Sequence, residues 1–66
     1  MTAMTIYADD VAVGDVLDSG AVVTDVDVYD DGALVIVDCT VVNDDGAVEI
    51  IGFGYDDLLP ILRATD

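Results

Sequence analysis

Apolar and polar residues alternate over short runs along most of this chain. Between Ala21 and Tyr29 the alternation places Val22, Thr24, Val26 and Val28 on one face and Val23, Asp25, Asp27 and Tyr29 on the other. A period of two residues predicts a β-strand with two unlike faces. Residues 33–42 are nearly all apolar and β-branched, which predicts a central strand covered on both sides. Its inward side chains are expected to be Val35, Val37, Cys39 and Val41.

Turns with the same chemistry separate these runs. An Asp and a Gly come just before Ala in three places, at residues 18–21, 31–33 and 45–47. Glycine supplies the positive φ of a tight turn, and Asp tolerates or caps it. The turns therefore predict consecutive hairpins in a meander of short strands.

Three further strands are expected near residues 2–7, 47–53 and 60–63. Gly52 and Gly54 indicate a bulge or bend, and Pro60 belongs at a strand start or at a sheet edge. Paired aspartates predict short helical turns near residues 8–12 and 56–59. Five strands with these turns predict a small five-stranded barrel. The competing fold, a two-layer α+β unit with a helix over residues 55–63, is disfavoured by Pro60.

The length bounds the architecture. Sixty-six residues make one domain, residues 1–66, with a thin core. Because 55% of the residues are hydrophobic, the chain is expected to fold rather than stay disordered. So small a barrel cannot hide every aliphatic side chain, which leaves a homo-oligomer open.

The net charge limits the classes of partner that the protein can bind. Fourteen Asp and one Glu stand against a single base, Arg63, and the net charge is −14. Such a field repels nucleic acid and anionic lipid and attracts basic surfaces. Direct nucleic-acid binding is not expected, because no basic patch exists to neutralise phosphates.

The residue types leave little room for catalysis. The chain has no His and no Lys, so it contains neither a Ser–His pair, a Cys–His pair nor a Schiff-base lysine. Cys39 lies in an apolar run and is read as a core residue rather than a reactive thiol. We therefore expect no enzyme activity, no catalytic residues and no cofactor.

The sequence predicts neither a dedicated metal site nor a targeting segment. Asp25 and Asp27 resemble the start of a calcium loop, but neither register gives the EF-hand spacing, so no dedicated metal site is expected. No signal peptide and no membrane-spanning apolar stretch is visible, which makes the cytoplasm the expected compartment.

The aspartates carry the functional signal. Two interpretations remain: a merely solvated surface, or a surface built to meet a basic partner. Asp25, Asp27 and Asp38 favour the second, because Asp is normally depleted from strands and like charges across strands destabilise a sheet. The candidate partner-binding residues are Asp25, Asp27, Asp30, Asp31, Asp38, Asp44 and Asp45.

Two segments of the chain resemble parts of a known class of small β-barrels. Residues 10–23 place an apolar pair, Gly14-Asp15, a glycine turn and a valine-rich run in an order that resembles the opening of small SH3-like barrels. Residues 56–63 resemble the helical turn and last strand of those barrels. The Val-, Asp- and Ala-rich, lysine-free composition also looks like that of small acidic proteins from phages of GC-rich actinobacteria, with haloarchaeal proteins as the other match.

Together these observations predict a non-enzymatic, phage-encoded binding protein that works in the host cytoplasm. It would engage a basic surface of a host protein, in the sharpest form as a nucleic-acid mimic or inhibitor. The alternatives are a structural module that forms homo-oligomers and a halophilic domain whose acidic surface only binds water.

Overall fold

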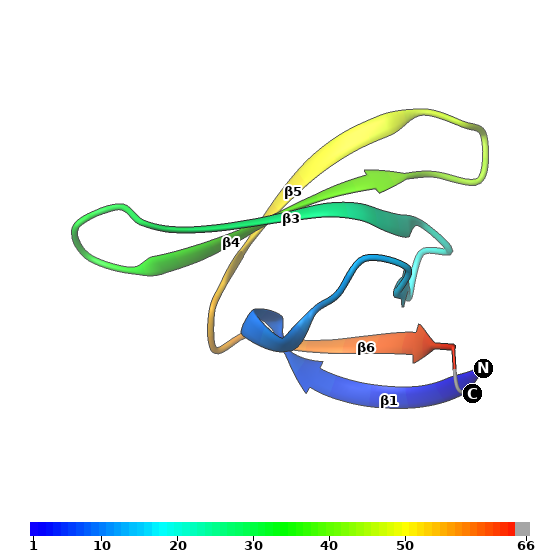
Figure 1. The fold of residues 1–66 in the computed structure, drawn as a ribbon, viewed down its shortest axis with the longest axis horizontal. Coiled ribbons are helices and arrows are strands. Elements are labelled where there is room, and N and C mark those ends of the chain that lie inside the picture. The colour runs from blue at the N-terminus through cyan, green and yellow to red at the C-terminus, as the bar shows by residue number, and fades with distance from the viewer. Residues whose placement is uncertain (65–66) are drawn as a thin grey trace.

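The computed structural model describes residues 1–64 as a single antiparallel β-sheet (Figure 1). Its six strands lie in the order β1-β6-β2-β3-β4-β5. One 3-10 helix, η1, follows β1, and no α-helix occurs in this part of the chain. The strands are β1 Thr2–Tyr7, β2 Val16–Leu17, β3 Val22–Asp30, β4 Val35–Val42, β5 Val48–Gly54 and β6 Leu58–Arg63, and η1 spans Ala8–Asp10.

The sheet is not closed into a barrel. Strands β1 and β5 end the strand order, and no ladder joins them. In Figure 1 the β3–β4–β5 part of the sheet lies above the β1–β6 pair, and the core fills the space between. The prediction of an all-β fold is confirmed, but the expected five-stranded SH3-like barrel is not, because the sheet has six strands and stays open.

The Asp–Gly turns form where the sequence predicts them. At the β4–β5 hairpin, Gly46 has a φ of 85°. The Asn43 N–H donates to the Ala47 carbonyl at 2.8 Å, and the Asp45 carboxylate accepts from the Ala47 N–H at 2.9 Å. Only glycine adopts such a φ without strain, so this hairpin depends on the residue at position 46.

The chain end differs from the prediction. The helical turn expected near residues 56–59 is absent, and a single turn closed by the Asp57 N–H on the Gly54 carbonyl at 3.0 Å stands there instead. Strand β6 then begins at Leu58 and runs through Pro60. Pro60 lies opposite Thr5 of β1, but the bond from the Ala8 N–H to the Asp57 carbonyl makes this a non-bonded pair, so the Pro60 nitrogen points away from β1. On its other side β2 ends at Leu17, opposite Ile61, so neither strand needs the missing N–H.

The core is small and aliphatic. Val37, Cys39 and Val41 of β4 are fully buried, as predicted, and Val35 is half-buried. Cys39 is thus a core residue. The full buried set is Ala8, Val11, Ala21, Val23, Val37, Cys39, Val41, Leu59 and Ile61.

A β-bulge in β3 changes the predicted faces. The register with β4 shifts between Val23 and Asp25, so Val23 pairs with Val41 and Val26 pairs with Cys39. Both valines therefore point into the core, although strict alternation places them on opposite faces. The expected grouping of Val23 with Asp25 and Asp27 is wrong, because the bulge turns the two aspartates outward.

Candidate functional site

Three aspartates gather on the outer face of the β3–β4–β5 part of the sheet. Asp25 lies opposite Thr40, and Asp27 lies opposite Asp38. Paired residues share a face of the sheet, and the next residue of β4, Cys39, points into the core. We call Asp25, Asp27 and Asp38 the acidic face.

The acidic face contains a cross-strand pair of like charges. Directly opposite side chains in an antiparallel ladder have Cβ atoms about 4.5–5.5 Å apart, and like charges there destabilise the sheet. Asp27 and Asp38 stand in this relation. Within residues 1–64 neither carboxylate has a basic partner, because the only side-chain cation, Arg63, pairs elsewhere.

Tyr29 reports the field of these carboxylates. The negative charge of Asp38 raises the pKa of the Tyr29 phenol above its ordinary value, and the charges of Asp31 and Asp27 raise this pKa further. The three carboxylates act on one phenol from β3, β4 and the hairpin between them. The negative potential therefore extends from the sheet toward the β3–β4 turn.

Asp38 also leans toward the neighbouring strand. Gly52 of β5 lies beside it, and a Cβ at position 52 would stand 3.0 Å from Asp38 Oδ1. The backbone of Gly52 has no positive φ, so no turn requires glycine there. The missing side chain leaves room for the Asp38 carboxylate over β5.

The other four candidate residues lie at the hairpin ends: Asp30 is the last residue of β3, and Asp31, Asp44 and Asp45 lie in turns. Asp30 Oδ1 accepts the Gly32 N–H at 2.8 Å, and Asp31 Oδ1 accepts the N–H groups of Ala33 and Leu34 at 2.9 and 2.8 Å. These backbone bonds hold the pKa of Asp31 below its ordinary value.

The second pair of turn aspartates lies at the opposite end of β4. Asp45 caps the β4–β5 turn, and the carboxylate of Asp44 lies against Gly20. The structure therefore does not bring the seven candidates into one patch. The structure gathers only the three aspartates of the acidic face on the sheet, and Asp31 lies near them in the β3–β4 turn.

An ion pair that the sequence analysis missed neutralises the only base. Arg63 donates from Nε to Asp15 Oδ1 at 2.9 Å and from Nη2 to Asp15 Oδ2 at 2.8 Å. Its Nη2 also reaches the Asp10 carbonyl at 3.0 Å, and the Ala12 N–H donates to Asp15 at 2.9 Å. Asp15 is only 2% exposed. The hydrogen bonds from Arg63 lower the pKa of Asp15, and those to Asp15 raise the pKa of Arg63.

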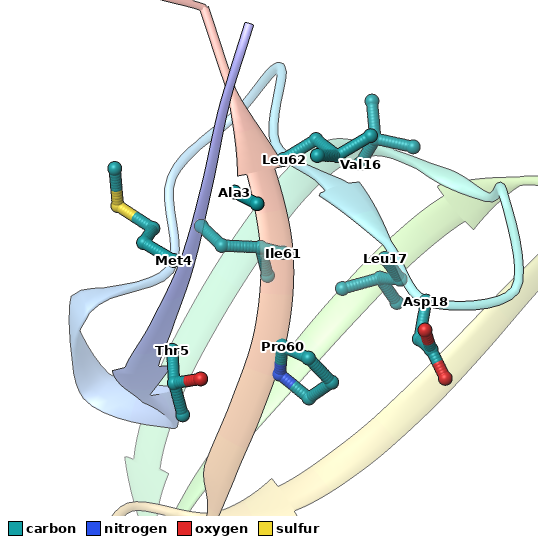
Figure 2. A pocket seen from close by; sticks show the side chains of 9 residues that line it. All are labelled: Ala3, Met4, Thr5, Val16, Leu17, Asp18, Pro60, Ile61 and Leu62. Carbon is teal, nitrogen blue, oxygen red and sulfur yellow. The ribbon is translucent and has the colours of Figure 1, made fainter.

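Two hollows lie away from the acidic face. One, of about 410 Å³, crosses β1, β6 and β2, and Figure 2 shows the side chains that line it, among them Thr5, Pro60 and Asp18. The other, of about 430 Å³, lies between β5 and the β2–β6 pair. Leu17, Ile51, Phe53 and Leu59 give the second hollow a mainly apolar lining.

Comparisons with protein-family models, with curated proteins and with solved structures find no match to this chain. In residues 1–64 no helix is long and apolar enough to cross a membrane. The same residues contain no group of three acidic or thiol side chains arranged to hold a metal ion.

Proposed function

We propose that this chain is a binding protein whose acidic face docks on a basic surface of a partner protein. The observation that carries the proposal is the placement of Asp27 opposite Asp38. Such a pair lowers stability by roughly 0.2–1 kcal/mol. A domain of 66 residues has only about 3–10 kcal/mol in total. A cost of this size, with no compensating cation in the described part of the chain, fits a surface kept for recognition.

The spacing of the carboxylates supports a partner that normally holds nucleic acid. Residues two apart on one strand face the same way about 6.7 Å apart, and neighbouring strands lie about 4.8 Å apart. Asp25, Asp27 and Asp38 form a two-dimensional array of negative charge on this grid. Carboxylates so arranged can replace phosphates in a basic groove. The resemblance to small phage proteins makes a host protein the partner that we propose.

Capture from an actinobacterial lysate tests this function. The immobilised protein is washed with a salt gradient, and the released proteins are identified by mass spectrometry. The proposal predicts one nucleic-acid-binding protein that leaves the column as salt rises, because screening weakens charge pairing. Release of every basic protein in proportion to its charge would contradict it.

A homo-oligomeric structural module is the second candidate. Val48 and Ile50 are 66% and 70% exposed on β5, an edge strand, and such apolar edges invite pairing with another chain. Size-exclusion chromatography with light scattering separates the two functions. A closed oligomer at micromolar concentration favours the structural module, and a monomer favours the binding protein.

A further inference from the structure

The edge of β5 has a defined hydrogen-bonding register. At one end of the β4–β5 ladder the Asn43 N–H donates to the Ala47 carbonyl, and at the other the Tyr55 N–H donates to the Val35 carbonyl at 3.1 Å. In an antiparallel ladder, bonded and non-bonded pairs alternate. Both ends therefore assign residues 49, 51 and 53 to the bonds with β4.

The intervening residues direct their backbone groups away from β4. Val48, Ile50 and Gly52 face an edge that no strand covers within residues 1–64. Gly54 would be next, but its N–H donates to Asp57 Oδ2 at 3.0 Å and its carbonyl accepts the Asp57 N–H. The open edge therefore offers the backbone N–H and carbonyl groups of three residues, and it ends at the turn that Asp57 closes.

The two sides of this edge differ in chemistry. On the outer side Gly52 has no side chain, so the Asp38 carboxylate is accessible across β5. On the inner side Ile51 and Phe53 border the 430 Å³ hollow. No residue of β4 lines this hollow, so it lies on the side of β5 away from β4. On its outer face a strand added to β5 would meet the exposed Val48 and Ile50 and, across Gly52, the carboxylate of Asp38. On its inner face it would meet a mainly apolar hollow that Asp18 and Ser19 also line.

We infer that the β5 edge binds an extended segment of a partner protein in which basic and apolar residues alternate. This inference rests on the proposed function and adds the form of the ligand. The backbone of the segment pairs with Val48, Ile50 and Gly52, a basic side chain opposite Gly52 extends toward Asp38, and its apolar side chains enter the cleft.

Charge argues against a second copy of the chain as the occupant and against β1 as the binding edge. A second copy of the chain would bring another acidic face and another net charge of −14 to the same edge. The other edge strand, β1, contains no acidic residue to attract a basic segment. Of the two sheet edges within residues 1–64, only the β5 edge places open backbone groups beside a residue of the acidic face, Asp38.

Fluorescence anisotropy with two labelled peptides tests the inference. One peptide alternates four Arg with four Val, and the other holds the same residues as a block of Arg followed by a block of Val. Both carry equal charge, but only the first presents one kind of side chain on each face of a strand. We expect the alternating peptide to bind at least about tenfold more tightly at physiological salt.

Two variants separate edge pairing from charge. Ile50→Pro removes an outward N–H and leaves the ladder with β4 intact, and it should weaken the alternating peptide by about tenfold or more. Ile50→Thr keeps the N–H and should change that affinity less than about threefold. Gly52→Val, which displaces the flexible Asp38 carboxylate, should weaken the alternating peptide and spare the block peptide. Circular dichroism checks that each variant folds. If Ile50→Pro does not fold, the affinity of Gly52→Val for the alternating peptide decides whether the β5 edge is the binding site.

The outcomes distinguish this inference from the proposed function. Equal affinity for the two peptides, or no effect of either blocking variant, overturns the edge inference. If replacement of Asp25, Asp27 and Asp38 by Asn still weakens both peptides, the acidic face retains its role. If that triple replacement weakens neither peptide, the proposed function fails as well.

Discussion

Removal of the Arg63 side-chain charge should destabilise the protein strongly. In Arg63→Met the Asp15 carboxylate, 2% exposed, loses both hydrogen bonds from the guanidinium and keeps only the Ala12 N–H. Breaking a buried ion pair costs about 3–5 kcal/mol, because one charge is left uncompensated. The Arg63 side chain is 33% exposed, so we take the lower end, about 3 kcal/mol.

The effect should be visible in unfolding curves. A loss of about 3 kcal/mol lowers the Tm of a domain this small by roughly 12–24 °C. Thermal and urea unfolding followed by far-ultraviolet circular dichroism measure it. The double variant Asp15→Asn, Arg63→Met should be more stable than Arg63→Met alone, since no unpaired charge remains buried.

The pH dependence of Arg63→Met gives a second check. In the wild type the pKa of Asp15 is lowered, chiefly by the hydrogen bonds from Arg63. Its contribution to stability is present above the ordinary carboxyl pKa and is lost only as pH falls through the lower folded value. Without Arg63, burial raises the Asp15 pKa, and protonation then favours the folded state. The stability gap between wild type and variant should narrow on acidification. A loss below 1 kcal/mol at pH 7, or a gap that widens, refutes this reasoning.

Three smaller perturbations follow from single contacts. Asp27→Asn should raise the free energy of unfolding by about 0.2–1 kcal/mol at low salt, because it relieves the repulsion from Asp38. The matched Asp25→Asn, opposite Thr40, should raise this free energy less in the same urea titration, and an equal increase would contradict the pairing. Gly46→Ala should cost about 1–2 kcal/mol because of its φ of 85°, and unchanged stability would remove that strain argument. Cys39 is fully buried, and burial raises the pKa of its thiol. A thiol reagent should therefore react with the folded protein at least about 100-fold more slowly than with the protein unfolded in urea. Fast labelling of the folded protein would contradict the burial of Cys39.

The features that sequence could predict are local ones. Residue alternation predicts β3, a nearly continuous apolar run predicts β4, and Asp–Gly chemistry predicts the hairpins that join β3, β4 and β5. The burial of Cys39 follows from the apolar run around it. Each of these depends on residues close together in the chain, so no tertiary information is needed.

The features that it could not predict depend on contacts between distant segments. Strand β2 has two residues and is defined only by its neighbours β3 and β6. The bulge after Val23 changes the faces of β3, and nothing in the alternation marks it. Closure of the sheet would need a ladder between β1 and β5, which residue patterns do not reveal.

The candidate site divides in the same way. The exposed strand aspartates could be identified from composition, but the pairing of Asp27 with Asp38 required the β3–β4 register. The partner of Arg63 was hidden among fifteen acidic residues, and Asp15 lies 48 positions away. A base that stands alone in such a sequence is nevertheless a signal, since a single cation is expected to hold a buried carboxylate.

The central claim is that the acidic face, rather than net charge, selects the partner. Three immobilised forms test it in the same lysate: the wild type, the variant with Asn at positions 25, 27 and 38, and a control with Asn at 9, 10 and 56. The control loses the same number of charges from carboxylates that accept no hydrogen bond within residues 1–64. We predict that the control retains the partner of the wild type and that the acidic-face variant loses it at about 0.15 M salt. Equal retention, or equal loss, by the two variants would contradict the account.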